Sequence, residues 1–160
     1  MRFLAAALVL LWPASAGASM NKTLDISAHA GRMQTDDWDA SGGSARLGQT
    51  FGPLRFGMGV AGFRPEVSER AHLVSTEWFW AYAPGGYHNV RPFIELRAHV
   101  DYLRLGDVAT TRGAAGLRAG VLLPLSEYFF LDAGIGRDVI GPDTMRATIG
   151  LGLPIPISHL

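Results

Sequence analysis

The sequence contains no cysteine and a single lysine, Lys22, and its formal net charge is zero. The lack of cysteine excludes a disulfide framework, a thiolate metal site and a cysteine nucleophile. The neutral charge argues against nucleic-acid binding, because no basic surplus exists to neutralise phosphates. After the first segment, every apolar stretch is broken by glycine, proline or a charge, so none reaches the roughly 20 residues of a transmembrane helix.

The first segment has the three parts of a secretory signal peptide. Arg2 gives it a positive start, Phe3–Trp12 is an unbroken apolar run, and small residues follow. The run is too short to span a bilayer of roughly 30 Å, which argues against a membrane anchor. We therefore expect an exported protein with a signal peptide over residues 1–18, cleaved after Ala16 or Ala18, and one domain over residues 19–160.

The remaining sequence alternates between apolar and polar residues with a period of two. The alternation is sharpest over 94–102, where Glu95, Arg97, His99 and Asp101 interleave with apolar residues. A helix would scatter these four polar residues around its circumference, whereas a strand aligns them on one face. The segment is therefore predicted to be a strand with one charged face.

Seven further segments show similar alternation, which gives eight predicted strands: 24–30, 44–51, 54–61, 70–82, 94–102, 112–123, 129–136 and 145–153. Turn-forming residues separate them in two alternating sets. One set is 52–53, 83–86 and 124–126; the other, expected to be longer, is Gln34–Gly43, Pro65–Glu69, Leu105–Thr111 and Val139–Asp143. Consecutive hairpins predict an all-β fold, an eight-stranded antiparallel up-and-down barrel.

Alternation alone does not tell whether the apolar face points inward, as in a soluble carrier, or outward, as in a membrane barrel. The polar rows contain no lysine, which is unusual for a face in water. Aromatic residues near strand ends resemble an interfacial girdle: Phe51, Trp78, Trp80, Tyr82, Tyr128 and Phe129. These features favour a transmembrane barrel.

The last strand resembles the C-terminal assembly signal of outer-membrane proteins through the spacing of Thr148, Gly150, Leu153 and Ile155, although the usual terminal aromatic residue is missing. Together with the eight segments, this gives the whole mature chain a resemblance to the small OmpA/OmpX-type outer-membrane barrels. The resemblance implies a bacterial outer-membrane location and a monomer with a structural or surface-interaction role. It also implies contact with outer-membrane lipid, including lipopolysaccharide, and with the barrel assembly machinery during insertion.

An eight-stranded barrel has an interior just filled by side chains. We expect the inward-facing charges to pair there, because an unpaired buried charge is costly. The predicted lumen network is Arg46, Arg55, Glu77, Glu95, Arg97, His99, Asp101, Arg112, Arg118, Asp132 and Arg146. The alternative is a proton-transfer dyad with His99 as base and Asp101 or Glu95 orienting it.

No catalytic residue, cofactor or metal site is predicted. The His-x-Ser-Asn string of lipid A deacylases on this fold is absent, no Ser/His/acid arrangement is visible, and the histidines are scattered, although His29 and His99 both point inward. The acidic run over 36–39 is interpreted as a solvated loop, since it lacks a calcium-loop pattern. Three alternatives stay open: a lipid A-modifying enzyme in the same membrane, a narrow pore, and a soluble calycin-like carrier.

Overall fold

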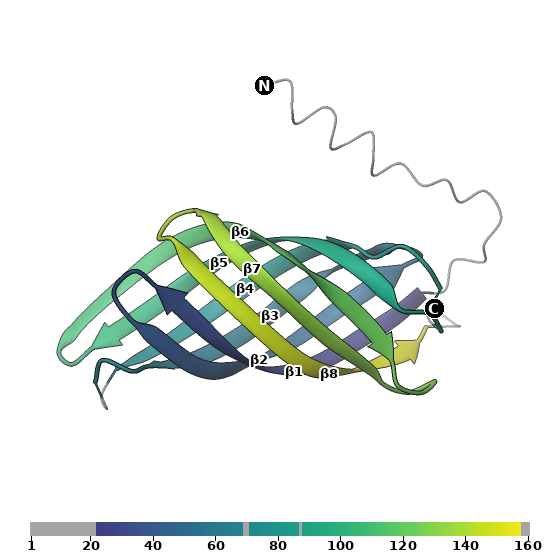
Figure 1. The fold of residues 1–160 in the computed structure, drawn as a ribbon, viewed down its shortest axis with the longest axis horizontal. Helices are drawn as coiled ribbons and strands as arrows, with labels where there is room; N and C mark the ends of the chain where they lie inside the picture. Colours follow the sequence, from purple (N-terminus) through teal and green to yellow (C-terminus); the bar gives the residue numbers. More distant parts are fainter. Residues whose placement is uncertain (1–21, 69–70, 87, 158–160) are drawn as a thin grey trace, which may run out of the picture.

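The protein is a closed barrel of eight antiparallel strands (Figure 1). The computed structural model describes residues 22–68, 71–86 and 88–157, so the predicted signal peptide lies outside the described residues. The strands are β1 (Lys22–Thr35), β2 (Asp39–Phe51), β3 (Leu54–Pro65), β4 (His72–Tyr82), β5 (Arg91–Leu105), β6 (Val108–Pro124), β7 (Phe130–Ile140) and β8 (Thr144–Pro156). Each strand pairs with the next, and β8 closes the barrel on β1. The predicted fold class is confirmed.

Across the described residues, no helix is long and apolar enough to cross a membrane.

Burial follows the predicted period of two along most of each strand, apart from the first residues of β6, which are exposed on both faces. On β5, Ile94 is 64% exposed and Leu96 50% exposed, whereas Glu95 and Arg97 are each 1% exposed. The apolar side chains therefore form the outer wall, and the charged side chains fill the interior. This arrangement is the inverse of a soluble carrier and matches a barrel whose wall is solvated by lipid.

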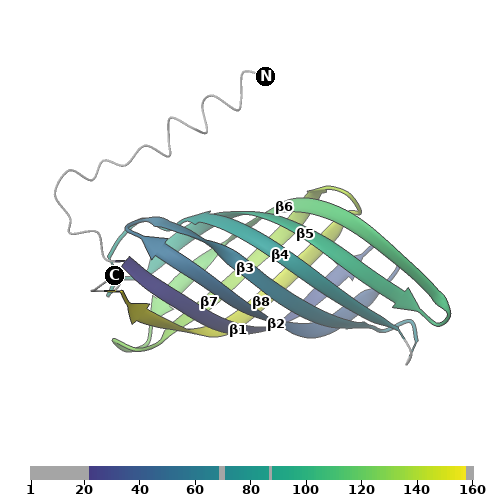
Figure 2. The same ribbon diagram turned by 180° about the vertical axis from the view of Figure 1, so that it is seen from behind.

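The hairpins differ from the expected loops at one end of the barrel. β1 and β2 are joined by residues 36–38 alone, and β5 and β6 by residues 106–107. The expected loops Gln34–Gly43 and Leu105–Thr111 are therefore wrong as loops, because most of their backbone is paired as strand. The longest connection, 83–90, lies instead at the end that holds both ends of the barrel chain (Figures 1 and 2).

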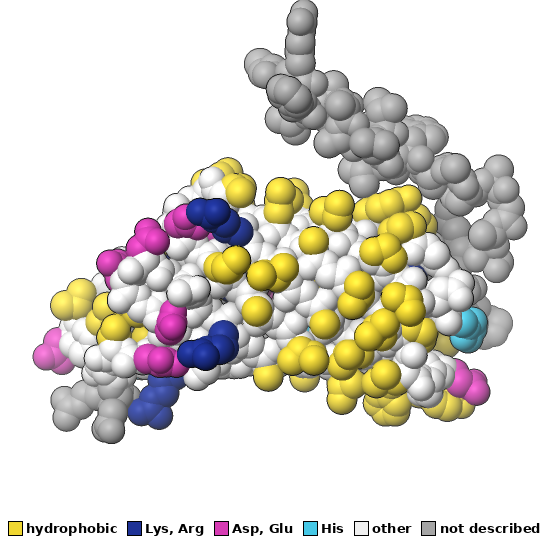
Figure 3. Space-filling model, viewed as in Figure 1, with side chains coloured by type: hydrophobic (Ala, Val, Ile, Leu, Met, Phe, Trp, Pro, Cys, Tyr) yellow, Lys and Arg dark blue, Asp and Glu magenta, His cyan; other side chains and the backbone are white. Residues whose placement is uncertain are grey.

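We call this end the terminal end, and the opposite end, with the turns 36–38, 66–71, 106–107 and 141–143, the distal end. On the face drawn in Figure 3, exposed charges gather at the distal end, and the coloured side chains over the middle of the wall are apolar. The exposed distal charges are Arg32, Asp36, Asp37, Arg64, Glu66, Arg104, Asp107, Arg137 and Asp143. The strands therefore extend beyond the apolar belt at the distal end.

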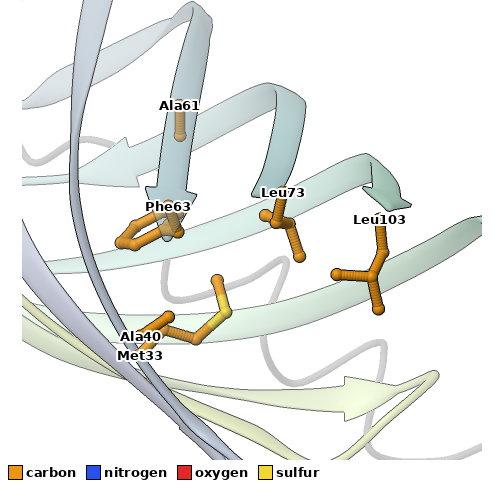
Figure 4. Close-up of a cluster of buried hydrophobic side chains, with 6 residues drawn as sticks. All are labelled: Met33, Ala40, Ala61, Phe63, Leu73 and Leu103. Carbon is orange, nitrogen blue, oxygen red and sulfur yellow. The ribbon is translucent and has the colours of Figure 1, made fainter. Parts of the chain in front are cut away.

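Two apolar clusters occupy the interior, one near each end. The distal cluster consists of Met33, Ala40, Ala61, Phe63, Leu73 and Leu103, with Trp38 packed against it (Figure 4). The terminal cluster consists of Ala83, Phe93, Leu122 and Phe130. The charged part of the lumen lies between them.

The hairpin of β5 and β6 reaches farther than the other distal hairpins (Figures 1 and 2). β6 pairs with β5 from Val108 onward, but its pairing with β7 begins only at Ala115. Residues 108–114 therefore have a strand on one side only, within the described barrel. Unpaired strand edges are sites where another polypeptide can add a strand.

Candidate functional site

The interior between the two apolar clusters holds most of the buried ionisable side chains of the described barrel. All eleven residues of the predicted lumen network lie on inward-facing rows, and ten of them are buried. The eleventh, Arg112, lies toward the distal end, where its side chain is 25% exposed. Four further charged or imidazole side chains share these rows and were not included in the predicted network: Asp25, His29, Arg91 and Asp138.

The first group of ion pairs crosses the lumen between opposite walls. Arg46 on β2 donates to Glu77 through Nε at 2.6 Å, and its Nη1 and Nη2 donate to the two oxygens of Glu95 at 3.0 and 3.1 Å. Arg118 on β6 lies on the other side of Glu95, at 3.5 Å, and donates to Asp132 through Nη2 at 2.5 Å. Glu95 is therefore held between two arginines.

The same group continues toward β1 through Asp132. This carboxylate lies 3.8 Å from Arg55 and 3.4 Å from Nε2 of His29. Arg55 in turn donates to Asp25 at 3.2 Å, and Thr50 donates to the same carboxylate. We name this continuous set of seven charges, from Glu77 to Asp25, the crossing network.

A second group, which we name the β5 network, surrounds His99. Its Nε2 lies 2.9 Å from Nη2 of Arg146 and 3.5 Å from both Asp101 and Asp138. Arg97 donates to Asp138 at 3.1 Å. Arg112 lies 3.9 Å from Asp101 and 6.0 Å from the ring centre of Trp38 in the distal cluster.

Phenylalanine rings pack against the guanidinium groups of four of these arginines. The guanidinium carbon of Arg46 lies 4.9 Å from the ring centre of Phe79, and that of Arg55 lies 5.3 Å from the ring centre of Phe130. The guanidinium carbon of Arg118 lies 4.7 Å from the ring centre of Phe93, and that of Arg146 lies 5.6 Å from the ring centre of Phe63. A planar guanidinium can stack on an aromatic face while its edge donates to carboxylates. The inward phenylalanines thus join the ionic networks to the apolar clusters, since Phe63, Phe93 and Phe130 belong to those clusters.

Opposite charges balance across the two networks taken together. The two networks contain six arginines and six carboxylates: Arg46, Arg55, Arg97, Arg112, Arg118 and Arg146 with Asp25, Glu77, Glu95, Asp101, Asp132 and Asp138. Buried charges persist when they are paired and hydrogen-bonded in this manner. The geometry is that of a packed ionic core.

The chemical possibilities of the site follow from its closure. Ser75 on β4 is fully buried and lies opposite Asp101, two residues from His99 on β5, so a serine, a histidine and an acid share one region. Sequence reasoning missed this proximity, which only the strand register reveals. His99, however, contacts Arg146 and two carboxylates, and the group lies between apolar clusters. Within the described residues, no cluster of histidine and acidic side chains could hold a metal ion.

The predicted aromatic girdle residues all lie at the outer wall or in terminal-end turns. Trp78, Trp80, Tyr128 and Phe129 are exposed, while Phe51 and Tyr82 are half-buried. Phe51 stacks on Phe56, a residue outside the predicted set, with ring centres 5.5 Å apart. Except for Trp78, the set is concentrated toward the terminal end. Its role at a membrane interface remains a prediction.

The omission of two lumen residues, Asp138 and Asp25, has an identifiable reason. Asp138 continues the inward row of Asp132, Gly134 and Gly136, but the expected turn Val139–Asp143 ended that strand too early. Asp25 lies in an alternating segment whose polar row was not counted. The signal for Asp138 was the period of two extended by two more residues, and the signal for Asp25 was its place on the polar face of the predicted strand 24–30.

A closed antiparallel barrel with an apolar wall and an ion-paired interior is a transmembrane β-barrel of the outer-membrane type. Solved structures with the same fold agree. The N-terminal barrel of Pseudomonas aeruginosa OprF has a TM-score of 0.63 at 17% identity, covering 82% of this chain and 97% of that one. Neisserial surface protein A has a TM-score of 0.60 at 18% identity, covering 82% and 96%.

A third similar structure is Ail, the attachment invasion locus protein of Yersinia pestis, with a TM-score of 0.57 at 11% identity, covering 86% of this chain and all of that one. No protein-family model and no curated protein matches the sequence. At these identities the likeness concerns the fold. It agrees with the class that the wall and the lumen define, an outer-membrane β-barrel.

Proposed function

We propose that this protein is a closed, non-conducting barrel that acts through its surface in the outer membrane, in a structural or surface-interaction role. The observation that carries the proposal is the composition of the lumen. Two ionic networks, which together contain equal numbers of arginines and carboxylates, fill its middle, and an apolar cluster lies near each end. Permeating ions would have to displace both kinds of packing.

The orientation of the barrel supports a role at the cell surface. Because the strand number is even, both ends of the barrel chain lie on one side, which is the periplasmic side in barrels of this type. The distal end then faces outward, and it has the exposed charges and the long β5–β6 hairpin. The one-sided edge at residues 108–114 gives this hairpin backbone groups that a partner could bind.

A non-enzymatic role fits the same geometry better than lipid modification. Ser75, His99 and Asp101 share a region of the lumen, but their side chains face inward, away from lipid, and are buried. An enzyme that acts on a membrane lipid needs its nucleophile and base within reach of the substrate. Removal of Ser75 should therefore leave the lipid composition of the membrane unchanged.

Planar-bilayer conductance tests the proposal. The purified barrel is inserted at constant voltage, and insertion is verified separately by a β-sheet circular dichroism spectrum and by protease resistance in the same lipid. We expect no steady conductance steps from the inserted protein. Large, steady steps would show a hydrated pore and overturn the proposal in favour of transport.

A further inference from the structure

The outer wall has a shallow apolar hollow over β5–β8. Its volume is about 340 Å³, and it is lined by Ile94, Leu117, Arg118, Ala119, Ile135, Gly136, Arg137 and Met145. The hollow lies on the face that contacts lipid, because its apolar side chains are all on outward rows. It is a depression in a wall that elsewhere has large exposed side chains.

The strand register explains why the wall is hollowed at this place. Ala119 on β6 pairs with Ile94 on one side and Ile135 on the other. The short side chain of Ala119 therefore forms the bottom of the hollow, between the larger side chains of Ile94 and Ile135. One pair closer to the distal end, Leu117 pairs with Arg137, and Arg137 pairs with Met145. The hollow thus leads from an apolar floor toward an arginine.

Arg137 gives the hollow a polar end. The side chain is 67% exposed, and it donates through Nε at 2.8 Å and through Nη2 to Asp143 in the distal turn. A guanidinium has five N–H donors, so these two bonds leave three for another acceptor. On β1, beside Ala147 of β8, Arg32 is also 68% exposed, and it is ion-paired with Glu66 at 3.2 Å. Two arginines therefore flank this part of the wall.

We propose that the hollow binds one acyl chain of a phosphorylated lipid of the outer leaflet, with the lipid phosphate bound by Arg137. The proposal rests on the proposed orientation, which places Arg137 on the outer-leaflet side. Lipid is the occupant that the surroundings supply, because the lining belongs to the apolar belt. Arginine binds phosphate through paired, charge-assisted hydrogen bonds.

A second copy of the chain fits this place less well. A two-fold interface centred on the hollow would bring the same surface of both copies together, with Arg137 of each copy near the other. Like charges in such a contact oppose association. A single acyl chain with an anionic headgroup has the complementary chemistry along the whole hollow.

Native mass spectrometry of the detergent-solubilised barrel, titrated with bisphosphorylated lipid A and with its dephosphorylated form, tests the proposal. Ala119→Phe fills the floor, and Arg137→Gln removes the cation. Matched controls are Ala45→Phe and Arg64→Gln, which change outward-facing residues on β2 and β3. We expect each test variant to bind phosphorylated lipid A about tenfold more weakly, while both controls bind as the parent does.

Equal loss in the controls, or equal binding of the dephosphorylated lipid, would overturn the proposal. Circular dichroism and conductance are measured on every variant, so that an unfolded variant is recognised. If Ala119→Phe does not fold, Ala119→Leu replaces it with a smaller filling side chain. A folded, non-conducting barrel without selective lipid binding would refute this inference and leave the proposed function intact. A conducting barrel that retains selective lipid binding would refute the proposed function and leave this inference intact.

Discussion

Arg118 offers the sharpest test of the ionic core. Its guanidinium donates to Asp132 at 2.5 Å and to Thr148 at 2.8 Å, and it lies 3.5 Å from Glu95. Arg118→Met keeps an unbranched apolar side chain near the ring of Phe93 and removes the charge, the donors and the stacking of the guanidinium on that ring. After the change, the ionic partners of Asp132 among the described residues are Arg55 at 3.8 Å and His29 at 3.4 Å.

The expected cost follows from this loss. Removing one partner of a buried ion pair leaves an uncompensated buried charge and typically costs about 3–5 kcal/mol. With a urea dependence of about 2 kcal/mol per molar, the unfolding midpoint should fall by roughly 1.5–2.5 M. Tryptophan fluorescence during urea unfolding in lipid vesicles measures this shift. Arg118→Met with Asp132→Asn should lose less than the sum of the single changes, because both partners of the pair are neutralised.

Arg104→Met is the matched control, because Arg104 is an exposed arginine on β5 that donates to the carbonyl oxygen of Gly106. We expect its midpoint to remain close to that of the parent. If Arg118→Met were as stable as Arg104→Met, the lumen charges would be solvated and the ionic-core argument would be wrong.

Three further predictions address the wall, the turns and the packing. Val100→Arg places a charge on the lipid face and should cost about 2–4 kcal/mol if Val100 lies near the bilayer midplane, measured by the same unfolding assay. The hydrogen bonds from Arg137 lower the pKa of Asp143 in the distal turn; since the folded pKa is depressed, the pair should persist above the ordinary carboxyl pKa and be lost as pH falls through the lowered value. An NMR titration of Asp143 that shows an ordinary pKa, unchanged by Arg137→Gln, would refute this. Gly120→Ala would place a Cβ against the backbone carbonyl oxygen of Ala133, whereas a Cβ at Gly62 meets no atom within 4 Å. Gly120→Ala should therefore lose about 1–3 kcal/mol by overpacking, and equal stability of Gly120→Ala and Gly62→Ala would contradict this.

The sequence was sufficient for the fold because lipid outside and a narrow lumen inside impose the same period on all eight strands. The row of Glu95, Arg97, His99 and Asp101 is inward for the same reason that Ile94 and Leu96 are outward. Strand ends were harder to predict. Beyond the belt, the distal hairpins remain paired although their side chains are polar, so the alternation fades before the backbone pairing stops.

Partner choice within the lumen could not be predicted. Period identifies which residues face inward, but only register and barrel closure decide that Glu95 lies between Arg46 and Arg118. The contact with Arg46 depends on the relative heights of β2 and β5, which are not neighbours, and the contact with Arg118 depends on the register of the β5–β6 hairpin, in which Glu95 and Arg118 pair directly. The apolar clusters were missed for a related reason: the inward rows change from polar to apolar near the strand ends, as at Leu103 on β5, where alternation no longer distinguishes the two faces.

Solvent access to the lumen tests the closed barrel most directly, and the absence of native cysteine makes the measurement clean. Ser75→Cys puts a thiol of similar size on a fully buried inward position, and Asp107→Cys puts one in the exposed distal turn. Each folded variant in lipid is treated with a charged, water-soluble thiol reagent, and labelling is followed by mass spectrometry. We predict that Asp107→Cys reacts fully, while Ser75→Cys reacts only after unfolding. Labelling of Ser75→Cys in the folded barrel at the rate of Asp107→Cys would contradict a closed lumen.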